Sequence, residues 1–162
     1  MTLLKTALTC QHKLTFCAGH RVHGTANRCA HLHGHNYALF ATAVADELDA
    51  QGRIIDFAAL RRTLGTWIND KWDRGFLLHR NDKAAIGIVQ GFLVDDEASI
   101  VQKLYLLPYN PTAENLARYL LEDICPELFA GQPIAIREIM IRETDNCYAA
   151  ATLYDAGDDD DE

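Results

Sequence analysis

Cysteine and histidine alternate along one short stretch of the chain, Cys29-Ala-His31-Leu-His33-Gly-His35. Side chains two positions apart share one face of a β-strand, so an extended conformation would point His33 and His35 the same way. Such a pair could hold a metal ion, but a catalytic zinc site usually has three protein ligands and one open position. The stretch therefore predicts a third ligand elsewhere in the chain. Solvated histidines in a polar turn are the alternative that the spacing leaves open.

A third histidine can reach this pair through strand pairing. Residues from about 3 to 18 alternate loosely and predict a first strand, with His20 just past its end on the parity of the apolar side chains. Residues 37–45 predict a second strand, and antiparallel pairing of the two would bring His20 beside the histidine pair. His20 is therefore the predicted third ligand, although spacing alone leaves three competitors, His12, His23 and His31.

The rest of the chain predicts two helices and several extended segments. Asp56 occupies an N-cap position, and apolar residues at helical spacing follow it through about Trp72. Thr112 can cap a second helix that ends near residue 128. Extended segments are predicted at 77–79, 86–94, 103–107, 134–144 and 147–154, the last two forming a hairpin turned at Asp145-Asn146. This order of elements predicts an α+β fold with an antiparallel sheet.

Composition and charge exclude several classes of protein. The chain has 162 residues, which predicts one domain over residues 1–155 followed by an acidic, disordered tail over 156–162. No basic stripe indicates nucleic-acid binding, and no apolar run is long enough to cross a membrane. The first residues lack the apolar core of a signal peptide, and the five cysteines form no Cys-x-x-Cys pair. These features indicate a cytoplasmic protein with reduced thiols.

Five short motifs occur in an order that points to a family: Phe16-Cys-Ala-Gly-His20, Cys29-x3-His33-Gly-His35, Ile55-Asp-Phe57, Asn110-Pro-Thr-Ala-Glu-Asn115 and Arg142-Glu-Thr144. Together they resemble the 6-pyruvoyltetrahydropterin synthase and 6-carboxytetrahydropterin synthase family, from about residue 8 to 155. The resemblance implies a tunnelling fold, in which a four-stranded antiparallel sheet carries two helices on one face. It also implies a homohexamer with active sites at subunit boundaries.

The resemblance also implies a role for each matching residue. The histidines that match His20, His33 and His35 hold Zn²⁺ in the family. The cysteine that matches Cys29 is the proton-abstracting thiolate, and the glutamate that matches Glu143 binds the guanidine-like edge of a pterin. Thr112 and Glu114 match positions that line the pterin pocket.

The three-residue gap between Cys29 and the His-Gly-His motif resembles the bacterial 6-carboxytetrahydropterin synthases of queuosine biosynthesis. The implied reaction is that of a zinc-dependent lyase, which converts 7,8-dihydroneopterin triphosphate to 6-carboxytetrahydropterin, acetaldehyde and triphosphate. Three alternatives stay open: the sibling reaction that gives 6-pyruvoyltetrahydropterin, a pterin-binding protein with little turnover, and a zinc hydrolase.

One position departs from the family pattern. The family usually has Asp-His after the first helix, where the histidine is a proton shuttle, and this chain has Asp73-Arg74. Arginine stays protonated at working pH and cannot act as a general base. Loss of a positioned acid–base group lowers rates by on the order of 10²–10⁴. Either His79 or His31 substitutes, or Arg74 binds triphosphate, or the enzyme is much weakened.

Overall fold

The computed structural model describes residues 7–91 and 102–154, so the predicted tail over 156–162 lies outside the described residues. The described strands are β1 (Cys10–His20), β2 (His33–Val44), β3 (Gly75–His79), β4 (Leu104–Leu107), β5 (Ala135–Arg142) and β6 (Tyr148–Thr152). They form one sheet in the order β4-β3-β1-β2-β5-β6. The α+β class predicted from the sequence is therefore confirmed.

Four of these strands form the antiparallel part of the sheet that the sequence predicts. β1 pairs with β2, β2 with β5 and β5 with β6, all antiparallel. The β5–β6 hairpin turns over residues 143–147, at the predicted Asp145-Asn146. The register of β1 on β2 places His20 directly opposite His33.

The prediction of a four-stranded, wholly antiparallel sheet is incomplete. β3 pairs parallel to β1, and β4 pairs parallel to β3, which gives a mixed sheet of six strands among the described residues. The segments 77–79 and 103–107 were expected to be extended, but their short apolar runs carry no periodicity that would assign a partner. The direction of these strands is set by tertiary pairing that the local sequence does not encode.

The first predicted helix is α1 (Phe57–Lys71), and the Asp56 side chain accepts a hydrogen bond from the Ala58 N–H at its start. A second helix, α2 (Lys83–Gly91), lies where the sequence predicted an extended segment over 86–94, so that prediction is wrong for residues 86–91. Ala85 and Val89 are one turn apart and both buried, which gives α2 a single apolar face. Residues 92–94 are outside the described part of the chain.

The second predicted helix is a continuous helical run with a change of pitch. It consists of α3 (Ala113–Tyr119), a π-helical turn (Leu120–Ile124) and α4 (Cys125–Leu128). Thr112 caps the run as predicted, because its hydroxyl accepts a hydrogen bond from the Asn115 N–H at 3.3 Å. Pro126 has no N–H to donate to a preceding carbonyl, which accounts for the irregular turn before it.

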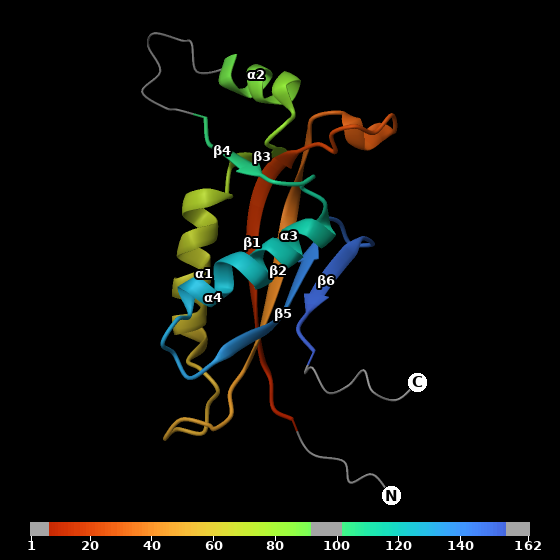
Figure 1. Cartoon of the computed structure of the whole chain (residues 1–162). Coiled ribbons are helices and arrows are strands. Elements are labelled where there is room, and N and C mark those ends of the chain that lie inside the picture. The colour runs from red at the N-terminus through yellow and green to blue at the C-terminus, as the bar shows by residue number, and fades with distance from the viewer. Residues whose placement is uncertain (1–6, 92–101, 155–162) are drawn as a thin grey trace, which may run out of the picture.

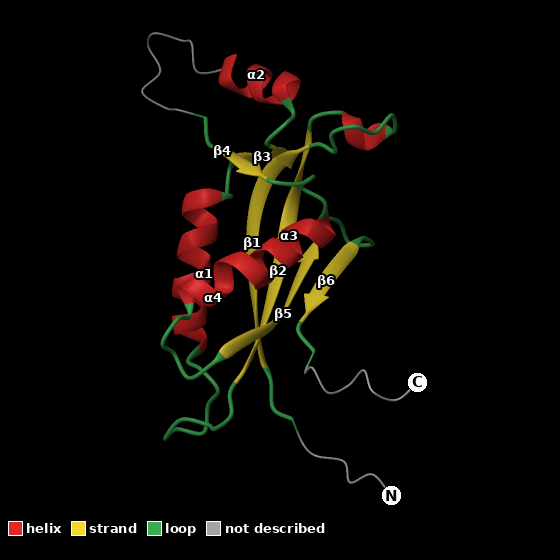
Figure 2. Cartoon of the chain, in the orientation of Figure 1, coloured by secondary structure: helices red, strands yellow, loops and turns green. Residues whose placement is uncertain are grey.

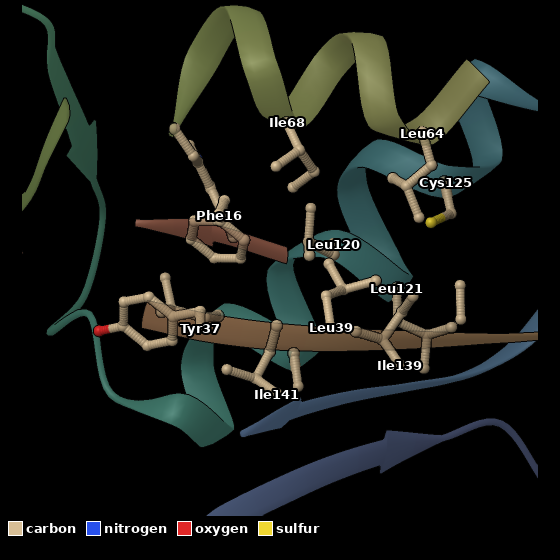
Figure 3. Close-up of a cluster of buried hydrophobic side chains, with 14 of the residues drawn as sticks. Phe16, Tyr37, Leu39, Leu64, Ile68, Leu120, Leu121, Cys125, Ile139 and Ile141 are labelled. Atoms are coloured by element: carbon tan, nitrogen blue, oxygen red, sulfur yellow. The ribbon is translucent and has the colours of Figure 1, made fainter. Parts of the chain in front are cut away.

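The core lies between one face of the sheet and the helices α1 and α3 (Figures 1 and 3). Phe16, Tyr37 and Leu39 from the strands meet Leu64 and Ile68 of α1 in this layer. These strand residues share the parity of His20, His33 and His35, so the histidines continue the core face at one end of the sheet. None of the helices in the described ranges is long and apolar enough to cross a bilayer.

Candidate metal centre

Strand pairing between β1 and β2 assembles three histidines on the core face of the sheet. His20 lies opposite His33, and His35 lies opposite Ala18, one step along the same face. One nitrogen from each of these histidines lies within 4.8 Å of the other two. Across residues 7–91 and 102–154 this is the one group of metal-capable side chains with such spacing, so the competitors His12, His23 and His31 are not part of it.

Hydrogen bonds to backbone carbonyls fix the protonation of two of these rings. His20 Nδ1 donates to the Pro111 carbonyl at 2.7 Å, and His33 Nδ1 donates to the His31 carbonyl at 2.7 Å. In neutral imidazoles the Nε2 atoms are then bare acceptors, and they face each other at 3.1 Å. Two facing lone pairs repel unless a cation lies between them. Zn–N bonds of about 2.0–2.1 Å would place two nitrogens about 3.4 Å apart on a tetrahedral ion.

The environment of His20 and His35 favours the neutral imidazole, which is the form that binds metals. His20 is 3% exposed, and burial lowers its pKa to about 4 against the support of the Pro111 hydrogen bond. Burial and the neighbouring His33 also lower the pKa of His35. Imidazoles must be deprotonated at the ligating nitrogen, so no proton need leave His20 at neutral pH before a metal enters.

The donor set therefore fits a divalent metal ion that prefers nitrogen ligands. Three imidazoles are a common ligand set for zinc, and carbonyl partners on the second nitrogens of His20 and His33 are the kind of support that such ligands usually have. His20, His33 and His35 could bind such an ion and leave one coordination position open. The identity of the metal as zinc stays a prediction.

A carboxylate lies next to the three-histidine cluster. Glu143 Oε1 is 3.9 Å from His20 Nε2, at the end of β5. Burial raises the pKa of Glu143, and the Glu114 carboxylate raises it further, while His33 opposes the shift. Glu114 is exposed in the first turn of α3, two residues after the capping residue Thr112. Three positions predicted from the sequence to contact substrate, Thr112, Glu114 and Glu143, therefore belong to elements that meet near the histidines.

Cys29 lies in a different local structure from the one its spacing suggests. It is the middle residue of a short 3-10 helix (Arg28–Ala30), and Asn27 Oδ1 accepts a hydrogen bond from its N–H at 2.9 Å. β2 begins only at His33, so the alternation that puts His33 and His35 on one strand face does not extend back to Cys29 and His31. The Cys29 thiol is exposed, and the Val22 N–H donates to the Cys29 carbonyl at 2.7 Å, which ties this turn to the end of β1.

Asp73 and Arg74 contact the sheet away from the histidines. Asp73 Oδ1 accepts a hydrogen bond from the Cys17 N–H at 2.9 Å, and the Arg74 N–H donates to the Cys17 carbonyl at 2.6 Å. The Arg74 side chain is 86% exposed and borders a cavity of about 350 Å³ that Gly34, His35 and Asn36 also line. The alternation of β2 places Gly34 and Asn36 on the face opposite the side chains of His33 and His35. Within one chain, position 74 is therefore not beside the metal centre.

A buried ion pair near Cys29 was missed by the sequence reasoning. Asp82 is 1% exposed and accepts two hydrogen bonds from the Arg21 guanidinium, which lowers the Asp82 pKa. Arg21 also donates to the Ala30 carbonyl at 3.3 Å, next to Cys29. Asp82 further caps α2 through the Ala85 N–H at 3.1 Å. An aspartate just before a helix was the one available signal, because the Arg21 contact spans 61 positions in sequence.

His79, which the sequence suggested as a substitute for the family histidine at position 74, lies near the Arg21–Asp82 ion pair. Its ring lies 5.6 Å from the ring of His23, and His79 Nδ1 accepts a hydrogen bond from the Asn81 N–H at 2.9 Å. His23 in turn has its Nδ1 3.8 Å from Asp82. The pair of imidazoles therefore lies beside the Arg21–Asp82 ion pair and not within the three-histidine cluster.

Comparison with known sequences gives a consistent set of relatives. The family model described as 6-pyruvoyl tetrahydropterin synthase matches residues 9–153. A 6-carboxy-5,6,7,8-tetrahydropterin synthase of Rickettsia felis is 36% identical over 141 residues, which cover 87% of this chain and 97% of the relative. The enzyme of the same name from Bacillus subtilis is 25% identical over 127 residues, which cover 76% and 70% of the two chains.

Solved structures show the same fold at lower sequence identity. An uncharacterized protein from Wolinella succinogenes superposes with a TM-score of 0.78 at 19% identity and covers 93% of this chain and 100% of its own. The 6-pyruvoyl tetrahydropterin synthase of Caenorhabditis elegans gives a TM-score of 0.62 at 19% identity, covering 94% and 100%. At these identities the likeness concerns the fold alone.

Proposed function

This chain belongs to the 6-pyruvoyl tetrahydropterin synthase family, and from that premise we propose that it is a zinc-dependent 6-carboxy-5,6,7,8-tetrahydropterin synthase. It would convert 7,8-dihydroneopterin triphosphate to 6-carboxytetrahydropterin, acetaldehyde and triphosphate, in queuosine biosynthesis. The observation that carries the proposal is the cluster of His20, His33 and His35 with its facing Nε2 atoms. The names of the sequence relatives, which are all 6-carboxy enzymes, support this product over the pyruvoyl one.

The three histidines would hold the metal, and the Pro111 and His31 carbonyls would keep the rings of His20 and His33 in place. When bound, the metal supplies Lewis-acid polarisation of the substrate's side-chain oxygens. Glu143 is 3.9 Å from His20 Nε2, close enough for a substrate that contacts the metal to reach the carboxylate as well. A carboxylate can accept paired hydrogen bonds from the guanidine-like edge of a pterin. Glu143 would thereby orient the ring, and Thr112 and Glu114 would border it.

Cys29 would move protons along the substrate side chain. The thiolate is the competent form of cysteine, and an exposed position in a turn gives it access to substrate. The hydrogen bonds from the Cys29 N–H to Asn27 Oδ1 and from the Val22 N–H to the Cys29 carbonyl hold the backbone of this turn. A fixed backbone is what a proton-transferring side chain needs to stay within reach of its substrate.

Arg74 favours a second candidate, a pterin-binding homologue with weakened turnover. Its guanidinium cannot accept a proton, and its exposed side chain borders a cavity that Gly34, His35 and Asn36 also line. The three-histidine cluster and Glu143 would still bind substrate in such a protein. The two candidates differ only in the rate of the chemical steps.

The same proposal includes a homohexamer whose active sites lie at subunit boundaries. Both outer strands of the described sheet expose large apolar side chains, Leu106 on β4 at 45% and Tyr148 on β6 at 69%. Unpaired edges of this kind favour pairing with another copy. Light scattering of the purified protein tests the assembly, and a monomer at micromolar concentration would contradict it.

The direct test is incubation of the zinc-loaded protein with 7,8-dihydroneopterin triphosphate, followed by product mass and an acetaldehyde assay. The expected result is 6-carboxytetrahydropterin with one acetaldehyde per product, and loss of turnover in Cys29→Ala. A 6-pyruvoyltetrahydropterin product without acetaldehyde would show that the protein catalyses the sibling reaction instead.

The Arg74→His variant separates the synthase from the weakened homologue. Arg74 has a φ of 57°, a backbone region in which histidine is enriched among non-glycine residues, so the variant fits the backbone. An increase in rate on the order of 10²-fold would indicate a weakened wild type. Equal, rapid acetaldehyde release from both proteins would show that position 74 carries no essential proton.

A further inference from the structure

Tyr37 carries a buried hydroxyl that has no hydrogen-bond partner. The residue is fully buried, and its Oη is one of two buried side-chain polar atoms without a partner in the described part of the chain. A tyrosine hydroxyl usually finds a partner when it is buried, because loss of its hydration is unfavourable. Phenylalanine would fill the same volume without that penalty, so the hydroxyl calls for an explanation.

The surroundings of the ring place this hydroxyl at the metal centre. Tyr37 follows His35 by two residues on the same face of β2. Its ring is edge-on to the His35 ring at 5.4 Å and to the His20 ring at 5.9 Å. Burial raises the pKa of Tyr37, and the Glu143 carboxylate is near enough to raise it further. The Tyr37 ring therefore lies against His20 and His35, and Glu143 is 3.9 Å from the same His20 ring.

Packing holds the ring in this orientation. Phe16 stacks on Tyr37 with ring centroids 4.9 Å apart and an angle of 12° between the planes. In Figure 3 the hydroxyl oxygen points away from Leu39, Leu121 and Ile139, out of the apolar layer. A ring clamped in this way cannot easily turn its hydroxyl toward a new partner within the protein. The Tyr37 hydroxyl oxygen therefore keeps the same position with or without a ligand.

We propose that Tyr37 is a positioning residue whose phenol O–H donates a hydrogen bond to a pterin-class ligand bound between the three histidines and Glu143. The inference rests on the proposed function and adds a polar contact that the family motifs did not assign. A neutral phenol is a donor, so its partner on the ligand is an acceptor, either a carbonyl-type oxygen or a ring nitrogen. Glu143 accepts hydrogen bonds and Tyr37 donates one. Glu143 would therefore contact donor groups of the ligand, and Tyr37 would contact an acceptor.

A comparison of two Tyr→Phe variants tests this role. Tyr37→Phe removes a hydroxyl that has no protein partner, whereas Tyr105→Phe removes one that is 2.7 Å from the Tyr119 hydroxyl. We expect the urea midpoint of metal-free Tyr37→Phe to equal or exceed that of the wild type. We expect the midpoint of Tyr105→Phe to fall, because its partner is left unpaired.

The ligand readout should show the reverse pattern. In Tyr37→Phe the zinc content should be unchanged, and KM for 7,8-dihydroneopterin triphosphate should rise roughly three- to tenfold. KM of Tyr105→Phe should stay within about twofold of the wild type. If the wild type binds the triphosphate without turnover, the same ratios are expected in its Kd.

Two outcomes would overturn the inference while leaving the proposed function intact. One is a urea midpoint of Tyr37→Phe that falls as far as that of Tyr105→Phe, which would mean that the Tyr37 hydroxyl forms a stabilising hydrogen bond within the protein. The other is an active wild type whose KM is matched by Tyr37→Phe. A wild type that neither binds nor converts the triphosphate would instead remove the proposed function, and this inference with it.

Discussion

Acid should destabilise the metal-free protein through His20 as the pH falls from 6.5 toward 4. Burial lowers the pKa of His20 from its ordinary 6.5 to about 4. Because the folded pKa is the lower one, the unfolded chain binds the proton better between these two values. The full stability is present above pH 6.5 and is lost as the pH falls toward 4. One pKa unit corresponds to about 1.4 kcal/mol, so the loss is about 2 kcal/mol by pH 5 and about 3 kcal/mol by pH 4.

Urea unfolding of chelator-treated protein at pH 7.5, 6, 5 and 4 measures this loss. Other groups also titrate, so the informative quantity is the difference between the wild type and His20→Gln, which has no proton to gain. The wild type should lose about 3 kcal/mol more than this variant between pH 7.5 and 4. His12→Gln, a half-buried histidine on the same strand, is the matched control and should follow the wild type.

Parallel pH profiles for the wild type and His20→Gln would refute the reasoning. They would mean that the imidazole is hydrated in solution and not enclosed beneath the Pro111 carbonyl. The same result would weaken the case for a preformed metal site, because a hydrated His20 would not be held facing His33.

Three further substitutions test contacts that support the site, each by urea unfolding at pH 7.5. Asp82→Ala should lower the free energy of unfolding by roughly 2–4 kcal/mol, because it leaves the Arg21 guanidinium and the start of α2 without their partner. A loss below about 1 kcal/mol would contradict a stabilising role for the Arg21–Asp82 ion pair. Gly19→Ala should cost roughly 1–3 kcal/mol, because its Cβ would lie 2.6 Å from the Phe76 ring, and the additional change Phe76→Leu should recover part of the loss. Thr112→Ala should cost about 1 kcal/mol through loss of the helix cap, whereas Thr112→Ser should be nearly neutral.

The β-strand period and strand pairing predicted that His20 can meet His33 and His35, although spacing alone left His12, His23 and His31 as competitors. His20, His33 and His35 follow the alternation of β1 and β2, which lie side by side in Figure 2, and the antiparallel register of the two strands sets His20 opposite His33. The family resemblance read from the short motifs is confirmed by the match over residues 9–153. The alternation of a β-strand does not reach Cys29. The Asn27 side chain accepts a hydrogen bond from the Cys29 N–H, and residues 28–30 form a 3-10 turn in place of a strand.

The misplaced elements depend on contacts between distant residues. α2 was predicted as extended because Ile86-Gly-Ile-Val is a short apolar run that fits either structure. Asp82 favours the helix, because its carboxylate caps the first turn of α2 through the Ala85 N–H. Arg21, directly after β1, holds this carboxylate in place by hydrogen bonds. The position of Arg74 on the opposite face likewise follows from the pairing of β3 with β1, which nothing near residue 74 encodes.

Metal analysis tests the central claim most directly. The purified protein, stripped with chelator and dialysed against zinc, should retain about one zinc per chain by inductively coupled plasma mass spectrometry. His33→Ala and His35→Ala should each lose it, and the controls His12→Ala and His23→Ala should retain it, because neither lies in the three-histidine cluster. A wild type that takes up no zinc, or cluster variants that bind as much as the controls, would contradict the account.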